Sequence, residues 1–271
     1  MAATIAMNDL KIDYASIEAA RKMTGLRLIL GGYAVPGPWR EACKGIFHVK
    51  KIPFVSVTAA GKDGTDKELV EWTAQASAPV AIWNDERPRS TWIEQLYLAE
   101  RLAPEPRLIP SKEQDRILMF GYTNEIAGEN GLGWCKRLTM ADAAVNDTSA
   151  PEATRRTWGY IGKKYGYTPE AAAGAKARVI EILNLLDRRL AENRARGSRF
   201  FVGDHLTALD IHWSTFAALF KPMSEDLCPM ATAFRGVYRE SNPEVMRALT
   251  PALLEHRDFV YREYLELPIV F

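Results

Sequence analysis

The stretch Gly203-Asp204-His205-Leu206-Thr207-Ala208-Leu209-Asp210 decides how this chain folds, and the apolar run 211–220 follows it. Thr207 is the predicted N-cap of a helix, because its hydroxyl can accept a hydrogen bond from the backbone N–H of Asp210. The Asp210 carboxylate can in turn accept from the N–H of Thr207, which makes a capping box with Asp in the place of Glu. Gly203 allows a tight entry into this cap. The pattern therefore predicts a buried central helix that begins at Thr207.

The composition limits the class of protein. With 271 residues and 47% hydrophobic content, the chain can bury a sizeable core, as one large domain or two smaller ones. A net charge of +1 gives no reason to expect nucleic acid or an anionic membrane as a partner. No stretch approaches the roughly 20 apolar residues of a membrane span, and no secretion signal opens the sequence. We therefore expect a cytoplasmic protein that does not bind a membrane.

Cysteine and histidine usage favours the same compartment. The three cysteines, Cys43, Cys135 and Cys228, are widely spaced, and no Cys-x-x-Cys occurs. The four histidines include no pair with the spacing of metal ligands. Reduced thiols are the better interpretation, and we expect no bound metal. Cys43 is more often a small core residue than a nucleophile.

The first part of the chain alternates strands and helices. Residues 26–30 predict a buried strand, apolar residues at helical spacing predict a helix over 38–50, and 51–57 predict a second strand. This order is typical of a βαβ unit, as at the start of a thioredoxin-like domain. Residues 77–83 predict a third strand, which Pro79 can open because proline donates no hydrogen bond to a ladder.

The later part of the chain is predicted to be helical. Ser90-Thr91 caps one helix, and the proline-containing segment 103–106 breaks it and reads as a linker. Ser111, which can form a capping box with Gln114, starts an almost continuous series of helices. Thr168-Pro169 opens the longest of them.

This helical part contains three glycines, Gly128, Gly131 and Gly133, in a span of six residues. Each costs a helix interior roughly 1 kcal/mol relative to Ala. The cluster therefore predicts a break or a close approach between backbones.

An α/β domain followed by an all-helical one across a proline-containing linker resembles the layout of the glutathione S-transferase superfamily. The pattern Gly-x-x-x-Thr-x-x-Asp ahead of a buried helix is similar to the local folding motif of that superfamily, and the resemblance spans about residues 25–250. It implies a thioredoxin-like glutathione-binding domain over 25–104, a linker over 105–110 and an all-α domain with an apolar tail over 111–271. Residues 1–24 would be an extension. The class within the superfamily stays open.

The resemblance also implies a glutathione site. Pro79 would follow a cis peptide bond, and the backbone of Ala78 would pair with the cysteinyl part of glutathione. The helix start at Ser90 and Thr91 would bind the γ-glutamyl carboxylate, because unpaired N–H groups and the helix dipole favour an anion there. The same hydroxyls also act as an ordinary helix cap.

The chain departs from the family pattern at three positions. Arg89 stands where an acidic residue is usual, which can strengthen carboxylate binding but removes the partner of the γ-glutamyl amine. Ser77 stands where Lys or Gln is common and weakens the contact with the glycyl carboxylate, for which Gln75 is a substitute. Gly37 stands where Ser or Cys would precede the proline, so thiol activation by those residue types is not expected.

A glutathione thiol is mostly protonated at neutral pH, because its pKa is near that of free cysteine, about 8.5. Tyr33 ends the first strand, and its phenol can donate a hydrogen bond to the thiolate; a tyrosine packed at a strand end is an equal alternative. Trp39 is interpreted as a wall of the site or as core. The residues proposed for the second-substrate pocket, with helix core as the alternative, are Tyr122, Asn124, Trp134 and Cys135.

These inferences favour a homodimeric glutathione transferase that conjugates glutathione to an apolar electrophile in detoxification. The alternative is a non-catalytic protein of the same fold that carries a ligand or acts as a scaffold, which Gly37, Ser77 and Arg89 favour. A glutathione-dependent reductase or lyase is a third interpretation. The missing cysteine at the helix start argues against the thiol-exchange form of it.

Overall fold

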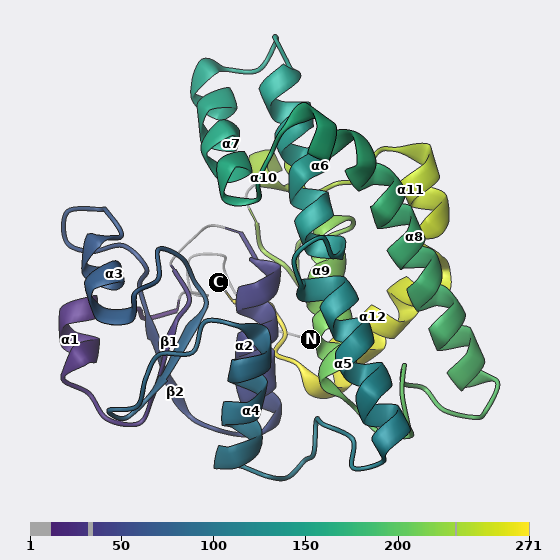
Figure 1. Ribbon diagram of the computed structural model, residues 1–271, viewed down its shortest axis with the longest axis horizontal. Helices are drawn as coiled ribbons and strands as arrows, with labels where there is room; N and C mark the ends of the chain where they lie inside the picture. Colours follow the sequence, from purple (N-terminus) through teal and green to yellow (C-terminus); the bar gives the residue numbers. More distant parts are fainter. Residues whose placement is uncertain (1–11, 32–34, 231, 271) are drawn as a thin grey trace. The chain divides into compact units, whose positions relative to one another are not determined.

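The computed structural model of the chain describes residues 12–31, 35–230 and 232–270 (Figure 1). Tyr33, the predicted thiol activator, lies outside the described residues. Within these ranges no helix is long and apolar enough to cross a membrane.

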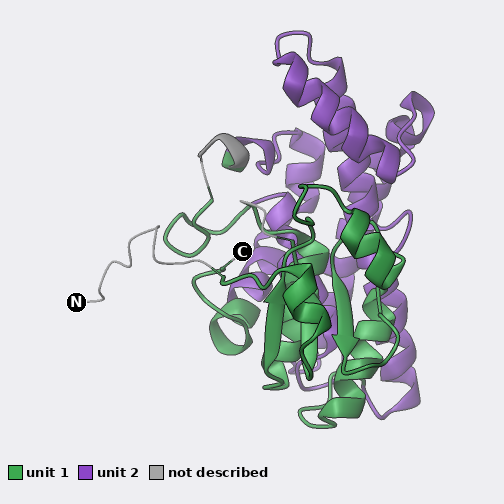
Figure 2. Ribbon diagram, turned by 90° about the vertical axis from the view of Figure 1, so that its left-hand side faces the viewer, with its two compact units in different colours: residues 1–109, 222–235, 259–271 green, residues 110–221, 236–258 purple. Residues whose placement is uncertain are grey.

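The chain divides into two compact units (Figure 2). Unit 1 contains the described residues of 1–109 together with 222–235 and 259–271, and unit 2 contains 110–221 and 236–258. Unit 1 is therefore built from three separate pieces of sequence, the last of which carries the apolar tail.

Unit 1 contains a three-stranded sheet of order β2-β1-β3. Strand β1 (Leu26–Ile29) pairs in parallel with β2 (Phe54–Val57) and antiparallel with β3 (Val80–Trp83). The register places Ile29 at the end of β1 opposite Val80 at the start of β3. The last residue of β1 and the first residue of β3 therefore lie side by side at the same end of the two strands.

Two pairs of helices flank this sheet (Figure 1). Helix α1 (Ile17–Arg21) packs with α3 (Lys67–Thr73), and their apolar side chains share a core cluster with Ile29. Helix α2 (Pro38–Val49) packs with α4 (Trp92–Leu102). The predicted βαβ unit, the third strand and the helix that begins after Thr91 are thus present.

The segment before β1 is joined to the sheet. Ala15 forms a parallel bridge with Val57, in which its N–H donates to the carbonyl of Ser56 at 2.9 Å and its own carbonyl accepts from Thr58 at 3.1 Å. Ser16 then caps α1 by accepting from the N–H of Ala19 at 3.2 Å. Residues 15–21 therefore take part in the sheet and in the core cluster of unit 1.

Unit 2 is helical in its described residues. Its principal helices are α5 (Glu113–Ala127), α6 (Leu132–Asn146), α7 (Glu152–Lys164), α8 (Pro169–Arg194) and α9 (Ala208–Phe216). Unit 2 also contains η1 (Ala217–Leu219) and α11 (Pro243–Ala248). Helices α10 (Thr232–Val237) and α12 (Pro251–Tyr264) each contain residues of both units.

Helix α9 is buried along its whole length and begins as predicted. The capping box is present, with the Asp210 carboxylate accepting from both the N–H and the hydroxyl of Thr207 at 2.8 Å. Its other oxygen accepts from the backbone N–H of Phe201 at 3.0 Å. The stretch 203–210 therefore leads into the buried central helix, as the sequence predicts.

Two further predicted helix starts, at Thr168 and at Ser111, differ in outcome. Thr168 caps α8 by accepting from the N–H of Ala171 at 3.1 Å, which confirms that prediction. The predicted box between Ser111 and Gln114 is wrong, because Lys112 has extended backbone and is itself the N-cap. The helix therefore starts one residue later than the box requires, and its N-cap side chain makes no capping hydrogen bond.

The glycine cluster separates α5 from α6, as predicted. Gly128 ends α5, and Gly131 is the N-cap of α6. A Cβ atom at Gly131 would lie 2.7 Å from the carbonyl oxygen of Glu125 and 2.8 Å from that of Gly128. This contact between backbones requires glycine at position 131.

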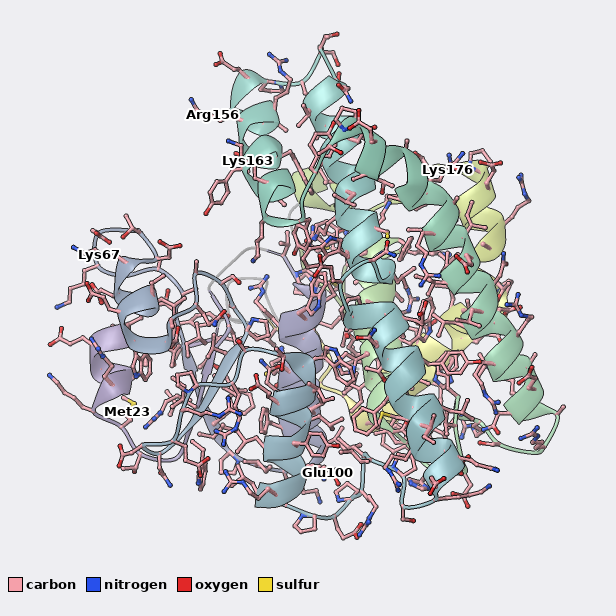
Figure 3. The ribbon with its side chains drawn as sticks, viewed as in Figure 1. Met23, Lys67, Glu100, Arg156, Lys163 and Lys176 are labelled. Carbon is pink, nitrogen blue, oxygen red and sulfur yellow. The ribbon has the colours of Figure 1, made fainter. Side chains whose placement is uncertain are left out.

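Three basic side chains of α7 and α8 lie on the surface. Arg156 and Lys163 on α7 and Lys176 on α8 are exposed and point away from their helices (Figure 3). Lys176 is paired with Glu244 at 2.5 Å.

Candidate functional site

The peptide bond between Ala78 and Pro79 is cis, which confirms what the family resemblance implies. Pro79 is buried and directly precedes β3, an edge strand of the sheet. No hydrogen bond to another described residue engages the backbone N–H or the carbonyl of Ala78. Unpaired backbone at the start of an edge strand can pair with an extended peptide.

Gln95 on α4 joins two parts of the candidate site. Its side-chain nitrogen donates to the carbonyl of Pro79 at 3.2 Å and to that of Arg89 at 3.3 Å, and only 1% of the residue is exposed. Ser90 therefore lies beside the start of β3. Sequence reasoning missed Gln95, although a polar residue four positions after Thr91 on a buried helix face was a usable signal.

The start of α4 carries the predicted anion site. Thr91 is the N-cap, with its hydroxyl accepting from the N–H of Glu94 at 3.3 Å. The Glu94 carboxylate accepts from the N–H of Thr91 at 3.3 Å and from its hydroxyl at 2.9 Å. The Ser90 hydroxyl, by contrast, is half-buried and makes no hydrogen bond to another described residue. Since the Thr91 hydroxyl is used in the capping box, the Ser90 hydroxyl is the one that can donate to a ligand.

Arg89 is directed at a carboxylate of its own unit. Its guanidinium lies 2.5 Å from Glu86, which Arg101 also reaches at 2.6 Å. Hydrogen bonds lower the pKa of Glu86, and the one from Arg101 has a larger effect than the one from Arg89. The backbone of Arg89 forms an isolated antiparallel bridge with Ala81 of β3.

The other predicted glutathione contacts lie in unit 1. Gln75 and Ser77 are half-buried in the segment between α3 and β3, and the backbone N–H of Gln75 donates to the Thr73 hydroxyl at 3.2 Å. Trp39 is half-buried in the first turn of α2. Their contacts with glutathione remain predictions.

The predicted second-substrate residues have different neighbours. Trp134 donates from its indole nitrogen to the carbonyl of Tyr165 at 2.9 Å, and their ring centroids are 5.0 Å apart. Cys135 is buried, which raises the pKa of its thiol. Tyr122 is half-buried, which raises the pKa of its phenol, and Asn124 is exposed. Among the described residues, no hydrogen bond or ring contact joins any two of these four predicted residues.

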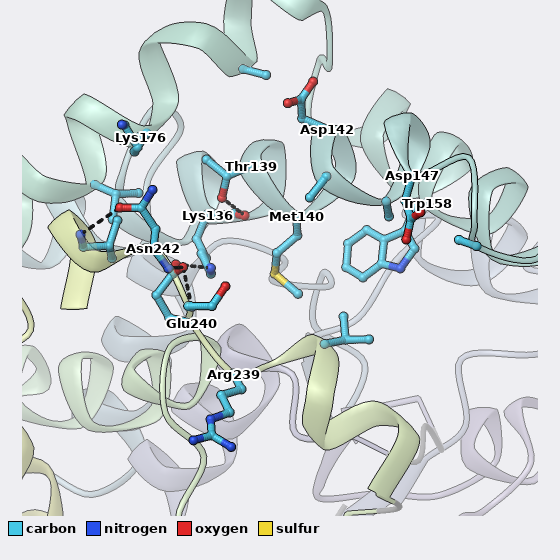
Figure 4. Close-up of a pocket in the computed structure, with 18 of the residues that line it drawn as sticks. Lys136, Thr139, Met140, Asp142, Asp147, Trp158, Lys176, Arg239, Glu240 and Asn242 are labelled. Carbon is cyan, nitrogen blue, oxygen red and sulfur yellow. Dashed lines mark hydrogen bonds and ion pairs between the residues drawn. The ribbon is translucent and has the colours of Figure 1, made fainter.

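A cavity of about 550 Å³ lies within unit 2, between α6, α7, α8 and residues 237–245 (Figure 4). Met140 and Trp158 are among its apolar walls, and Lys136 lies 2.5 Å from Glu240 in a largely buried ion pair. None of the four predicted second-substrate residues lines this cavity. The cavity is therefore distinct from the predicted pocket.

Metal and cysteine chemistry find no support in the described residues. No group of three or more His, Cys, Asp or Glu side chains in those ranges could hold a metal ion. Cys43 on α2 is buried, and burial raises the pKa of its thiol. A protonated, inaccessible thiol is a poor nucleophile.

No family model matches the chain, and no curated protein matches it by sequence. Solved structures do match. A glutathione S-transferase of Methylobacterium radiotolerans, in complex with glutathione sulfonate, is 18% identical at a TM-score of 0.58, over 89% of this chain and 93% of that one. Glutathione transferase Omega 3C of Trametes versicolor is 14% identical at a TM-score of 0.54, over 92% and 90%.

The β-etherase LigF of a Sphingobium species is also similar, with 17% identity and a TM-score of 0.52, over 88% of this chain and all of that one. These likenesses cover nearly the whole of each chain. The chain therefore has the glutathione transferase fold, a thioredoxin-like α/β domain followed by an all-α domain, as the sequence predicts.

Proposed function

We propose that the chain binds glutathione in unit 1 and catalyses the attack of its thiolate on an electrophilic carbon of an apolar compound. One observation carries this proposal. The unpaired backbone of Ala78, beside the cis bond to Pro79, and the Ser90 hydroxyl are held close together by Gln95. An extended tripeptide with an anionic end has the groups that such a site recognises.

Each part of glutathione would meet a different group. Ala78 would pair through its backbone with the cysteinyl residue, and Ser90 would donate to the γ-glutamyl carboxylate at the positive end of α4. Gln75 and Ser77 would approach the glycyl end. Tyr33 would donate to the sulfur, and the rate would come from a lowered thiol pKa and from the proximity of the two substrates.

Glutathione affinity, measured by isothermal titration calorimetry, tests the binding site. Ser90→Ala should weaken binding about 10-fold, since a hydrogen bond to a charged group contributes roughly 1.5–3 kcal/mol. Ser16→Ala is the matched control, because Ser16 caps another helix of the same unit. Equal affinities for the wild-type protein and Ser90→Ala would remove Ser90 from the site. No binding by the wild-type protein at millimolar glutathione would refute the proposed function.

Conjugation of an aryl halide tests the chemistry. Tyr33→Phe should lower the turnover while glutathione retention stays nearly unchanged. Unchanged turnover in this variant would remove Tyr33 from its proposed role.

A non-catalytic ligand carrier or scaffold is the second candidate, favoured by the glycine at position 37. It predicts glutathione binding without turnover across a panel of halides, epoxides and enones.

We further propose a homodimer in the cytoplasm that acts in detoxification. The molar mass measured by light scattering tests the dimer.

A further inference from the structure

A lysine amine is buried in the wall of the cavity of unit 2. Lys136 lies on α6 and is only 6% exposed. Its Nζ lies 2.5 Å from a carboxylate oxygen of Glu240 (Figure 4), and it also lies 5.3 Å from the centroid of the buried Phe220 ring. The cavity that this lysine lines has a volume of about 550 Å³, and its apolar walls include Met140 and Trp158. A cavity of this size can enclose a small organic molecule.

The carboxylate beside this amine has hydrogen bonds of its own. One oxygen of Glu240 accepts from the backbone N–H groups of Ser241 and Asn242, both at 2.8 Å, and the other accepts from Lys136. The Glu240 side chain is 10% exposed. These backbone bonds hold the carboxylate in place when Nζ changes its own bonding. The ion pair is neutral as a whole, so an ionic ligand beside it would bring an unpaired charge into a largely buried space.

The other charged groups of the wall lie where water or a partner balances them. Lys176 forms an exposed ion pair with Glu244, and Asp147 and Arg239 are exposed. Asp142 is half-buried and accepts two hydrogen bonds. A neutral occupant is therefore favoured, since the charged side chains that line the cavity balance in number: the cations are Lys136, Lys176 and Arg239, and the carboxylates are Asp142, Asp147 and Glu240.

The buried amine of Lys136 also differs in protonation from a second buried lysine of the chain. Burial lowers the pKa of Lys136, Glu240 offsets only part of this effect, and Arg137 on the same helix lowers the pKa further. Burial lowers the pKa of Lys44 as well, but two carboxylates outweigh it there and the pKa is raised. A lysine in an apolar pocket can act as a nucleophile towards a carbonyl compound, because its neutral amine has a free electron pair.

We propose that the cavity of unit 2 binds a neutral, apolar aldehyde and that Lys136 condenses with it to form an imine. This inference is independent of the glutathione site, which belongs to unit 1. The apolar walls enclose the alkyl or aryl body of the aldehyde, and its carbonyl carbon meets Nζ. Exclusion of water by the occupant protects the imine from hydrolysis.

The condensation balances within the ion pair. Glu240 takes one proton from the Lys136 ammonium, and the electron pair left on Nζ forms a bond to the carbonyl carbon while the π electrons move to oxygen. One proton from Nζ and one from Glu240 convert that oxygen to water, which leaves with the C–O electron pair. The nitrogen electron pair then completes the C=N bond. The protonated imine carries the same charge as the ammonium, so Glu240 keeps a cationic partner.

Reductive trapping with hexanal and sodium cyanoborohydride, followed by peptide mass spectrometry, identifies the lysine that forms the imine. At neutral pH and without glutathione, Lys136 should be alkylated at least about 10-fold faster than Lys176, since each unit by which the pKa of an amine falls raises its neutral fraction about 10-fold. Lys176 is the matched internal control, because it lines the same cavity at an exposed position. Glyceraldehyde, a polar aldehyde, should show no such preference.

Two variants and a competitor place the reaction in the cavity. Lys136→Arg keeps a cation beside Glu240 but cannot form an imine, so trapping at position 136 should be lost while Lys176 reacts as before. Ala144→Phe narrows the cavity, which Ala144 lines, and should slow trapping at Lys136 several-fold. Hexan-1-ol, which can occupy the cavity without reacting, should compete with hexanal. Urea unfolding of each variant shows that the fold persists.

The wild-type protein alone can overturn the proposal. Equal trapping rates at Lys136 and Lys176 would do so, because they are the result expected for ordinary surface amines. A rate at Lys136 that rises in proportion to hexanal without saturation, or that hexan-1-ol leaves unchanged, would also overturn it. The pH at which trapping at Lys136 is half-maximal should lie below 10.5, the ordinary pKa of lysine, and a higher value would contradict the proposed nucleophile. Glutathione binding, measured separately, is unaffected by any of these outcomes.

Discussion

His256 Nε2 lies 3.0 Å from Oδ1 of Asp210, and neither side chain is exposed to solvent. The same carboxylate accepts from the N–H of Phe201 and from the N–H and hydroxyl of Thr207. The rings of His256 and Phe201 are in edge contact, with centroids 4.6 Å apart. One buried carboxylate thus joins the start of α9 to two other segments of unit 2.

Asp210→Asn should lower the free energy of unfolding by about 3 kcal/mol, because a buried donor that loses its acceptor costs roughly 1–3 kcal/mol and this side chain accepts several hydrogen bonds. The amide nitrogen of asparagine would face backbone N–H groups and could not accept from them. Urea unfolding followed by circular dichroism measures the change. Asp204→Asn is the control, because its side chain is 93% exposed and should change stability by less than about 0.5 kcal/mol. Similar transitions for the two variants would contradict a central role of the capping box.

His212 should make stability depend on pH. Burial lowers its pKa from 6.5 to about 4, and its Nδ1 donates to the carbonyl of Ala208 at 2.7 Å. The unfolded chain therefore binds a proton between these two pH values while the folded chain does not. The free energy of unfolding should fall by about 2 kcal/mol from this group as the pH drops from about 7.5 to about 5.

Urea midpoints at several pH values test this dependence on His212. His212→Gln should remove that part of the slope, whereas His205→Gln should keep it, because His205 is largely exposed. A slope that is identical in the wild-type protein and His212→Gln would show that His212 is not the titrating group.

Two glycine substitutions should act in opposite directions. Gly131→Ala should destabilise by about 1–3 kcal/mol, because its Cβ would overlap two backbone carbonyls. Gly159→Ala in α7 should stabilise by up to about 1 kcal/mol, because a Cβ there meets no atom within 4 Å and alanine favours a helix. Thermal unfolding of both variants measures the difference. A neutral Gly131→Ala would show that the turn relaxes without cost.

Lys50→Met should destabilise unit 1. The Lys50 side chain is fully buried, lies 2.7 Å from Glu100 and donates to the carbonyls of Ala103 at 2.7 Å and Pro106 at 2.9 Å. Removing the charge leaves Glu100 without its cation, which should cost about 3–5 kcal/mol. Lys67→Met, at an exposed position, is the matched control and should be nearly neutral. Equal unfolding midpoints would contradict this role of Lys50.

Most of the fold could be predicted from short-range patterns in the sequence. The Thr207 cap needs only a partner three residues away, and the strands and helices of unit 1 follow from hydrophobic spacing. The cis bond before Pro79 could be predicted only from the family resemblance, because the local sequence alone would favour a trans bond.

The candidate site was harder to predict because its positioning contacts join residues that are separated in sequence. Gln95 reaches a carbonyl 16 residues away, and Arg40 reaches one 10 residues away. A polar residue on a helix does not reveal which distant backbone group it will meet. The sequence at Gly37 also did not reveal that the guanidinium of Arg40 occupies the space that a side chain at position 37 would need.

The divided sequence of unit 1 has a consequence for how the protein is made. Ile269 donates to the carbonyl of Leu227, and Val270 accepts from Lys44 on α2, so these late residues complete the packing of a unit whose sheet is translated first. During synthesis, the nascent sheet domain must wait until the ribosome releases residues 259–270 before it acquires these contacts. A short truncation at the carboxyl end would therefore destabilise unit 1 more than the helices of unit 2 that precede these residues in translation.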